Sequence, residues 1–179
     1  TYHPLTLSSE HESINEINEL IKALSQLKDT LQIFTMPNAD PGNNTIFKII
    51  NSYIKDNDHA FSFTSLGQLR YLSCLNQVDA VIGNSSSGLL ETPSFNIGTI
   101  NLGDRQKGRL AAKSVINIKS ESKLILKSID KLYSSEFKKI LKNNYNPYGE
   151  GDASKKIVSI LKDITIDSLL KKTFNDIDL

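Results

Sequence analysis

The sequence contains few sulfur-bearing residues. It holds one cysteine, one methionine and no tryptophan in 179 residues. The single cysteine, Cys74, excludes an internal disulfide and a metal site built from several cysteines, and it is typical of a reducing cytoplasm. No apolar run approaches the roughly 18 residues of a membrane span, and no signal-peptide pattern is present. We therefore expect a cytoplasmic protein without a membrane, metal or cofactor partner.

An excess of charge of one sign is also absent. Lysine and arginine total 21 against 20 for aspartate and glutamate, which leaves a net charge of +1. Such a balance offers no broad electrostatic field that would attract nucleic acid or an anionic membrane surface. Binding of an anion must therefore depend on a local cluster. The length fits one domain with an appendage and is sufficient to bury a core.

Strand and helix patterns alternate along the chain. Short apolar runs predict strands at 31–36, 60–63, 80–83, 98–102 and 114–118, and apolar residues at helical spacing predict helices at 14–27, 46–53, 66–75, 86–95, 121–133 and 152–163. Parallel strands need crossover connections, which are usually helical. The alternation therefore predicts an α/β fold with a parallel sheet and helices on both of its faces.

Both ends of the sequence carry features that indicate neighbouring structure. Thr1-Tyr2-His3-Pro4 is typical of a strand end running into a loop, because proline favours extended geometry before it and resists a continuing strand. The chain is therefore expected to be cut from something longer. We predict one domain over 1–163, followed by a segment at 164–179 whose apolar residues dock on a missing neighbour.

The strongest candidate site follows the apolar strand at 80–83, which we expect to be buried. The sequence there is Asn84-Ser85-Ser86-Ser87-Gly88, so the strand delivers small hydroxyl residues and a glycine onto a helix start. Unpaired amides and the helix dipole favour an anion at such a place, and a pyrophosphate would fit. The alternative is that one serine merely caps the helix.

Four further features lie beyond predicted strand ends, where parallel sheets collect their ligands. Glu91 could accept hydrogen bonds from vicinal hydroxyls, and Arg105 in the loop 103–109 could offer a planar fork to phosphate or carboxylate. Asn38 and Asp40 follow the strand at 31–36, and His3 ends the first strand. Each has an ordinary alternative: a solvated charge, an Asx turn or a structural histidine. Their convergence on one rim favours a site.

These motifs resemble the C-terminal domain of the hydrolysing UDP-N-acetylglucosamine 2-epimerases of sialic-acid and related pathways. The resemblance covers nearly the whole chain and depends on the order and spacing of five segments. These are Thr1-Tyr2-His3-Pro4, Pro37-Asn38-Ala39-Asp40, Ile82-Gly83-Asn84-Ser85-Ser86-Ser87-Gly88 with Glu91, the run 100–109, and Tyr148-Gly149-Glu150-Gly151-Asp152-Ala153. Two departures are Leu110, where relatives often have a polar residue, and Pro93, which shortens the helix that carries Glu91.

The resemblance implies a glycosyltransferase-B architecture, in which this chain is the second of two Rossmann-like domains. It implies conversion of UDP-N-acetylglucosamine and water to N-acetylmannosamine and UDP, with acid and base residues on a separate N-terminal domain and a homo-oligomeric full-length enzyme. His3 would lie near the diphosphate and sugar as the catalytic residue of this half. The UDP contacts would be Asn38, Asp40, Leu66 through its backbone, Asn84, Ser85, Ser86, Ser87, Gly88, Glu91 and Arg105.

Two other functions fit the same residues. A glycosyltransferase of this architecture would use the same loop for its donor diphosphate, and a non-catalytic module would sense a nucleotide sugar. The sugar could be N-acetylglucosamine or a 2,4-diacetamido-6-deoxy relative, since most sugar contacts would come from the other domain.

Overall fold

The computed structural model describes residues 1–5, 10–37 and 43–165. The chain forms two compact units, Thr1–Tyr148 and Gly149–Leu179. None of the helices in these described ranges has the length and apolar content that crossing a membrane requires. The predicted boundary at 163 and the docking of 164–179 on another domain stay predictions.

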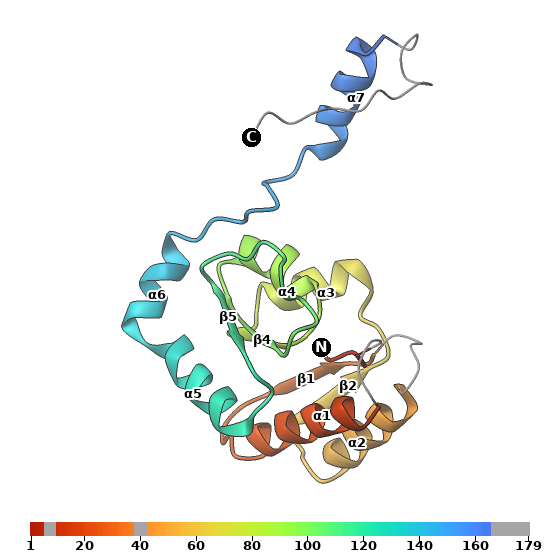
Figure 1. Ribbon diagram of the computed structural model, residues 1–179. Coiled ribbons are helices and arrows are strands. Elements are labelled where there is room, and N and C mark those ends of the chain that lie inside the picture. Colours follow the sequence, from red (N-terminus) through yellow and green to blue (C-terminus); the bar gives the residue numbers. More distant parts are fainter. Residues whose placement is uncertain (6–9, 38–42, 166–179) are drawn as a thin grey trace, which may run out of the picture. The chain divides into compact units, whose positions relative to one another are not determined.

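The first unit contains all five strands of the described residues and six of their α-helices (Figure 1). In chain order the elements are α1 (Glu10–Leu24), β1 (Gln32–Thr35), α2 (Asn43–Lys55), β2 (Ala60–Phe63), α3 (Gly67–Leu75), β3 (Ala80–Gly83), α4 (Ser87–Leu90), η1 (Thr92–Phe95), β4 (Gly98–Leu102), β5 (Val115–Ile118), α5 (Ser122–Tyr133) and α6 (Ser135–Lys142). Every predicted strand is present, and the alternation is confirmed.

The strands form two parallel sheets. Strand β1 pairs with β2, with Thr35 opposite Phe63 at their carboxyl ends. Strands β3, β4 and β5 form the second sheet, in which Gly83 lies opposite Asn101. Because all pairs are parallel, the loops that follow β3 and β4 leave the same edge of the sheet.

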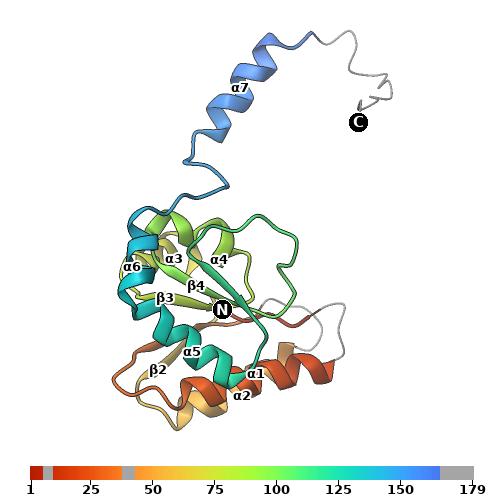
Figure 2. The same cartoon turned by 60° about the vertical axis from the view of Figure 1, so that its left-hand side comes forward.

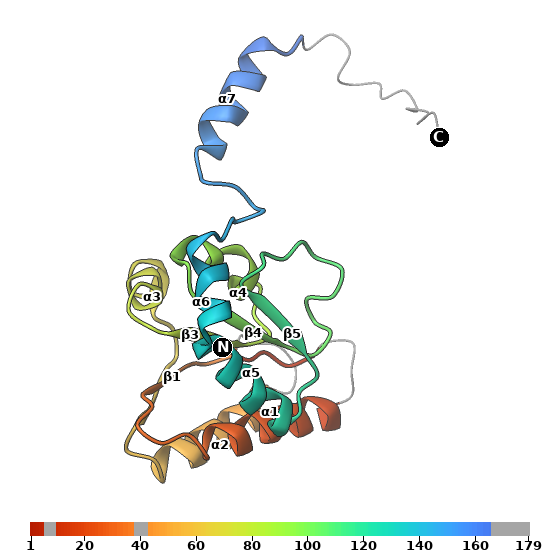
Figure 3. The same ribbon diagram turned by 90° about the vertical axis from the view of Figure 1, so that its left-hand side faces the viewer.

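Helices cover both faces of these sheets, as the sequence predicted. Helices α1, α2 and α5 lie together on one side of the strands, and α3 and α4 lie on the other (Figures 1 and 3). The core between them is made of aliphatic and aromatic side chains that are buried almost completely, among them Ile17, Leu20, Ile46, Ile50, Ile100, Leu102, Ile125 and Phe137. Burial of each such side chain stabilises the fold by about 1.5–3 kcal/mol.

Two helical predictions differ from the structure. The helix predicted at 86–95 is interrupted, because α4 ends at Leu90 and a separate 3-10 turn, η1, begins at Thr92 and contains Pro93. Helix α6 has no counterpart among the predicted helices. Ser134 caps its start, since the Ser134 hydroxyl accepts a hydrogen bond from the Phe137 amide at 3.1 Å, and α6 buries Phe137. In the sequence, α6 could have been found from this capping serine, which precedes an aromatic residue by three positions.

Strand β3 is less buried than its composition predicts. Ala80, Val81 and Ile82 form an apolar run of the kind found in interior parallel strands, yet all three are only half-buried. The neighbouring strand β4 is buried at every position. The difference arises at the edge of β3 that faces away from β4 (Figure 2).

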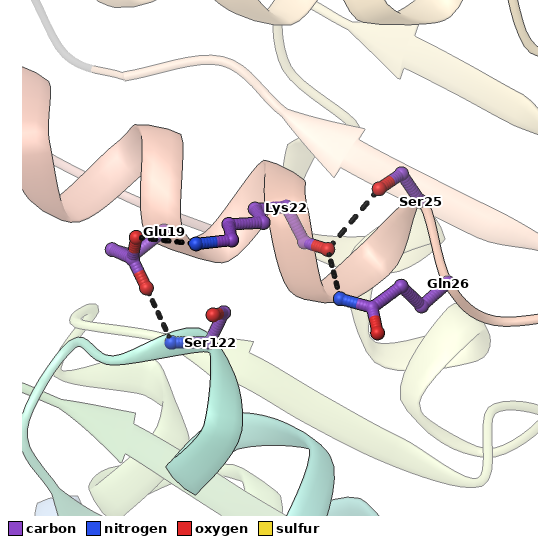
Figure 4. A network of polar contacts seen from close by, with 5 residues as sticks. All are labelled: Glu19, Lys22, Ser25, Gln26 and Ser122. Carbon is purple, nitrogen blue, oxygen red and sulfur yellow. Dashed lines mark hydrogen bonds and ion pairs between the residues drawn. The ribbon is translucent and has the colours of Figure 1, made fainter.

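A carboxylate joins α1 to the start of α5. Glu19 Oε2 accepts a hydrogen bond from the Ser122 amide at 2.7 Å, and its other oxygen lies 3.5 Å from Lys22 Nζ (Figure 4). The Ser122 hydrogen bond, with a smaller contribution from Lys22, lowers the pKa of Glu19 below its usual value. The charged form therefore holds the first turn of α5 against α1.

Helix α7 (Ala153–Asp163) belongs to the second unit and is exposed along its whole length. Its apolar residues Ile157, Val158, Ile160 and Leu161 are each about half exposed or more.

Replacing the carboxylate of Glu19 should make stability depend less on pH. Because the folded-state pKa of Glu19 is lowered, its contribution is complete above its unfolded value of about 4.5 and is lost as pH falls through the folded pKa. We expect Glu19→Gln to lower the melting temperature at pH 7, and this difference to shrink as pH falls below 4.5 toward 3. Melting curves from pH 3 to 7 test this. A constant difference across that range would contradict it.

Candidate functional site

The first residues of the chain lie alongside β3. The Thr1 nitrogen donates to Ile82 O at 3.1 Å, and the Asn84 amide donates to Thr1 O at 3.2 Å, which is the pattern of a parallel ladder. A β-carbon at Gly83 would lie 1.8 Å from Thr1 O. Gly83 therefore permits the close approach that brings the predicted strand end at residues 1–3 to the carboxyl end of β3.

Asn84 holds this first segment in place. It is fully buried, its Oδ1 accepts from the His3 amide at 2.7 Å, and its Nδ2 donates to His3 O at 2.8 Å. The amide side chain thus satisfies both main-chain groups of His3, whose side chain is also buried. Tyr2 adds a second anchor, because its hydroxyl donates to Glu16 Oε2 at 2.8 Å. Burial, reinforced by the Glu16 charge, raises the pKa of Tyr2.

The carbonyl of Asn84 accepts hydrogen bonds from the loop that follows β4. Arg105 Nη1 donates to this oxygen at 3.0 Å and Gln106 Nε2 donates to it at 2.8 Å. Gln106 is buried, and its Oε1 has no hydrogen-bond partner among the described residues. Arg105 is exposed, so its guanidinium lies beside Asn84 with its remaining donors directed to solvent or ligand. Gln106 was missed from sequence because a polar residue in a polar loop gives no signal.

The three serines after Asn84 are half-buried and differ in their contacts. Ser87 Oγ makes a short contact with Tyr71 Oη, and Ser85 Oγ accepts a long hydrogen bond of 3.4 Å from the Ser87 amide. Ser86 precedes α4 but its hydroxyl does not cap the helix. Within the described residues, the amides of Ser85 and Ser86 donate to no protein group. We call the amides and hydroxyls of Ser85 and Ser86, together with the Arg105 guanidinium that contacts Asn84, the cradle.

Helix α4 adds little electrostatic field to this cradle because it contains four residues. Glu91 ends that helix and is half-buried, and its charge is one of the causes that raise the pKa of Tyr71, after burial of the phenol itself. Tyr71 was not predicted as a site residue. Its position on α3 brings it against Ser87, which only the packing of α3 on α4 decides.

The structure brings together most of the predicted site residues but not all. His3 and Arg105 both contact Asn84 at the carboxyl end of β3, and residues 85–88 follow it directly. Glu91 lies at the other end of α4, where its charge acts on Tyr71. Leu66 lies at the start of α3 and is half-buried. Asn38 and Asp40 lie outside the described residues.

A parallel sheet covered by helices on both faces, with polar residues beyond the carboxyl ends of its strands, defines a Rossmann-like α/β protein of the glycosyltransferase-B type. The chain belongs to the UDP-N-acetylglucosamine 2-epimerase family, whose sequence profile matches residues 1–162.

Three relatives illustrate this membership. The chain is 44% identical over 179 residues to a GDP/UDP-N,N'-diacetylbacillosamine 2-epimerase (hydrolyzing) of Campylobacter jejuni, covering 99% of this chain and 46% of that protein. It is 38% identical to the polysialic acid biosynthesis protein P7 of Escherichia coli, covering 90% and 41%. The crystal structure of UDP-GlcNAc 2-epimerase from Neisseria meningitidis bound to UDP-GlcNAc matches with a TM-score of 0.63 at 21% identity, covering 84% and 41%. The chain therefore spans about half the length of these relatives.

Truncating Asn84 should release the first segment. Asn84→Ala removes the two hydrogen bonds from its side chain to the buried main chain of His3, and loss of a buried partner costs about 1–3 kcal/mol. We expect the free energy of unfolding to fall by about 2–4 kcal/mol in urea denaturation. The matched control is Asn143→Ala, because Asn143 is exposed and its side chain makes one hydrogen bond, of 3.3 Å to Lys139 O. Equal stability of the two variants would refute the anchoring role.

Proposed function

We propose that this chain is the C-terminal, nucleotide-binding domain of a hydrolysing UDP-N-acetylglucosamine 2-epimerase. The whole enzyme would convert UDP-N-acetylglucosamine and water to N-acetylmannosamine and UDP, without a cofactor. The observation that carries the proposal is the gathering of His3, Ser85, Ser86 and Arg105 around Asn84 in a member of this family. Supporting it, a fold neighbour from Neisseria meningitidis was solved with UDP-GlcNAc.

The cradle would bind the diphosphate of the substrate. The amides and hydroxyls of Ser85 and Ser86 are short, neutral donors, and the Arg105 guanidinium supplies positive charge with a planar set of donors. Such donors suit phosphate oxygens better than they suit a carbohydrate, because hydrogen bonds to a charged acceptor are roughly twice as strong as neutral ones.

The chemistry assigned to this domain is stabilisation of the leaving group. Elimination of UDP would break the bond between the anomeric carbon and the phosphate oxygen while a base takes the C2 proton and the C1–C2 double bond forms, so negative charge grows on the departing phosphate. Donors that are already in position lower this barrier without reorganising. The resulting 2-acetamidoglucal is then hydrated on the other face. The acid and base groups would belong to the N-terminal domain, and His3 would lie between the diphosphate and the sugar.

The remainder of the nucleotide would lie against α3 and α4. Glu91 is half-buried and would accept hydrogen bonds from the ribose hydroxyls, while the backbone at Leu66 would receive the uracil. Ser87 and Gly88 would complete the wall of the diphosphate site, and Asn84 would act by holding His3 and Arg105. Asn38 and Asp40 would add contacts from the loop after β1. The full-length enzyme would be a homo-oligomer.

A second candidate substrate, which differs in its sugar, also has specific support. The Campylobacter jejuni relative, 44% identical, is named for N,N'-diacetylbacillosamine, a 2,4-diacetamido sugar. The two substrates can be compared by supplying the full-length protein with either UDP-sugar and identifying the products by mass spectrometry. Release of the free sugar without an acceptor supports an epimerase, whereas a requirement for an acceptor would support a glycosyltransferase. Binding without turnover would support a sensing module.

Titration calorimetry of the full-length protein with UDP tests the cradle. We expect Arg105→Ala to weaken binding about tenfold or more, because it removes a charged donor to phosphate. The matched control is Arg109→Ala, an exposed arginine of the same loop whose side chain contacts no cradle residue among the described ones. Absence of heat at millimolar UDP, or equal losses in the two variants, would contradict the proposal.

A further inference from the structure

Gln106 is a buried glutamine in an exposed loop. Its side chain is 4% exposed, whereas the residues at 104–105 and 107–111 on either side of it are exposed. Glutamine is a residue that normally lies at the surface, where water satisfies both ends of its amide. The burial of Gln106 therefore needs a physical reason, which its contacts supply.

The protein compensates this burial only in part. Gln106 Nε2 donates to Asn84 O at 2.8 Å, but Gln106 Oε1 has no hydrogen-bond partner among the described residues. A buried acceptor without a partner lowers stability, and an apolar side chain of similar size would avoid that cost. The need for a stable core therefore does not explain a glutamine at this position. What glutamine adds to an apolar side chain is the donor to Asn84.

The oxygen that receives this donor belongs to the peptide unit that joins Asn84 to Ser85. None of the peptide bonds that the structure describes is cis. A trans peptide is planar, and its C=O and N–H point in opposite directions. The N–H of this unit is the Ser85 amide, which belongs to the cradle and donates to no protein group among the described residues. A bond that fixes the direction of Asn84 O therefore also fixes the direction of the Ser85 N–H.

Two side chains donate to Asn84 O, and they differ in how firmly they are held. The carbonyl has two lone pairs, so it accepts from Arg105 Nη1 at 3.0 Å and from Gln106 Nε2 at 2.8 Å together. Arg105 is exposed and is free to turn toward a bound anion, whereas Gln106 is buried. Gln106 is therefore the donor that stays on this oxygen when a ligand engages Arg105. Donors on the carbonyl also polarise the peptide and strengthen its N–H as a donor.

We propose that Gln106 is a positioning residue of the cradle, because its buried amide holds the Asn84–Ser85 peptide unit with the Ser85 N–H directed at the diphosphate. Gln106 acts through this peptide and does not contact the ligand itself. The inference rests on the proposed function and names the group that prearranges its leaving-group site. A donor that is already aimed at the departing phosphate lowers the barrier without reorganising.

Gln106→Met tests the proposal in the full-length protein. Methionine is similar in length and apolar, so it removes the unpaired Oε1 together with the donor, and Asn84 O keeps Arg105 as a partner. We expect a melting temperature within about 2 °C of the native protein. We expect calorimetry to show UDP affinity weakened about tenfold, because the Ser85 N–H is no longer held in place.

The matched control is Gln26→Met. The Gln26 amide also donates to a main-chain oxygen at 2.8 Å, that of Lys22, but Gln26 is exposed and contacts no cradle residue among the described ones. We expect this variant to bind UDP with native affinity.

A cycle of variants tests the shared oxygen without a ligand. Arg105→Ala and Gln106→Met each leave Asn84 O with one side-chain donor, whereas the double variant leaves it with none. We therefore expect the double variant to lose roughly 3 °C or more of melting temperature beyond the sum of the single changes. Peptide-resolved hydrogen exchange of residues 103–111 reports this loop alone, and it should show the same non-additive loss of protection.

Each outcome supports or overturns the proposal. Native UDP affinity in Gln106→Met would overturn it, and so would a melting temperature lowered by roughly 5 °C or more, which would make Gln106 a structural residue. Additive effects in the cycle would also overturn it, because the two donors would then act on separate groups. If the native full-length protein gives no heat with UDP, the proposed function fails. A non-additive cycle would then still support the hold of Gln106 on the peptide unit, and an additive cycle would overturn it.

Discussion

The candidate site depends on one pair of hydrogen bonds, those between the Asn84 side chain and the main chain of His3. An asparagine amide donates from its nitrogen and accepts at its oxygen, so it satisfies both His3 groups without burying a charge. Because Asn84 is fully buried, water cannot replace these bonds. The backbone carbonyl of the same residue then draws in Arg105 and Gln106.

The anion site that we propose belongs to a nearly neutral chain. The positive charge is confined to Arg105, and the other donors are amides and hydroxyls that carry no net charge. The short helix α4 contributes little dipole, so the cradle relies on groups in direct contact with the ligand. The chain belongs to the UDP-N-acetylglucosamine 2-epimerase family and spans about half the length of the relatives it matches.

The first residues of the chain connect the two sheets to the candidate site. The segment at residues 1–3 contacts both sheets, because Thr1 bonds to β3 and touches Thr35 of β1. On the helical side, the Glu19 contact joins α1 to α5.

Local patterns in the sequence predicted the strands and most helices, and the edge of the sheet at which the candidate site lies. Periodicity identified every strand, and strand ends placed His3, Ser85 and Arg105 on one edge, because parallel strands share a direction. Three features needed the tertiary structure: the Tyr71 contact with Ser87, the buried Gln106, and the half exposure of β3. Each depends on which distant segments meet, and spacing along one chain carries no information about that. The apolar run of β3 predicted an interior strand, whereas only the packing showed a cavity along its edge.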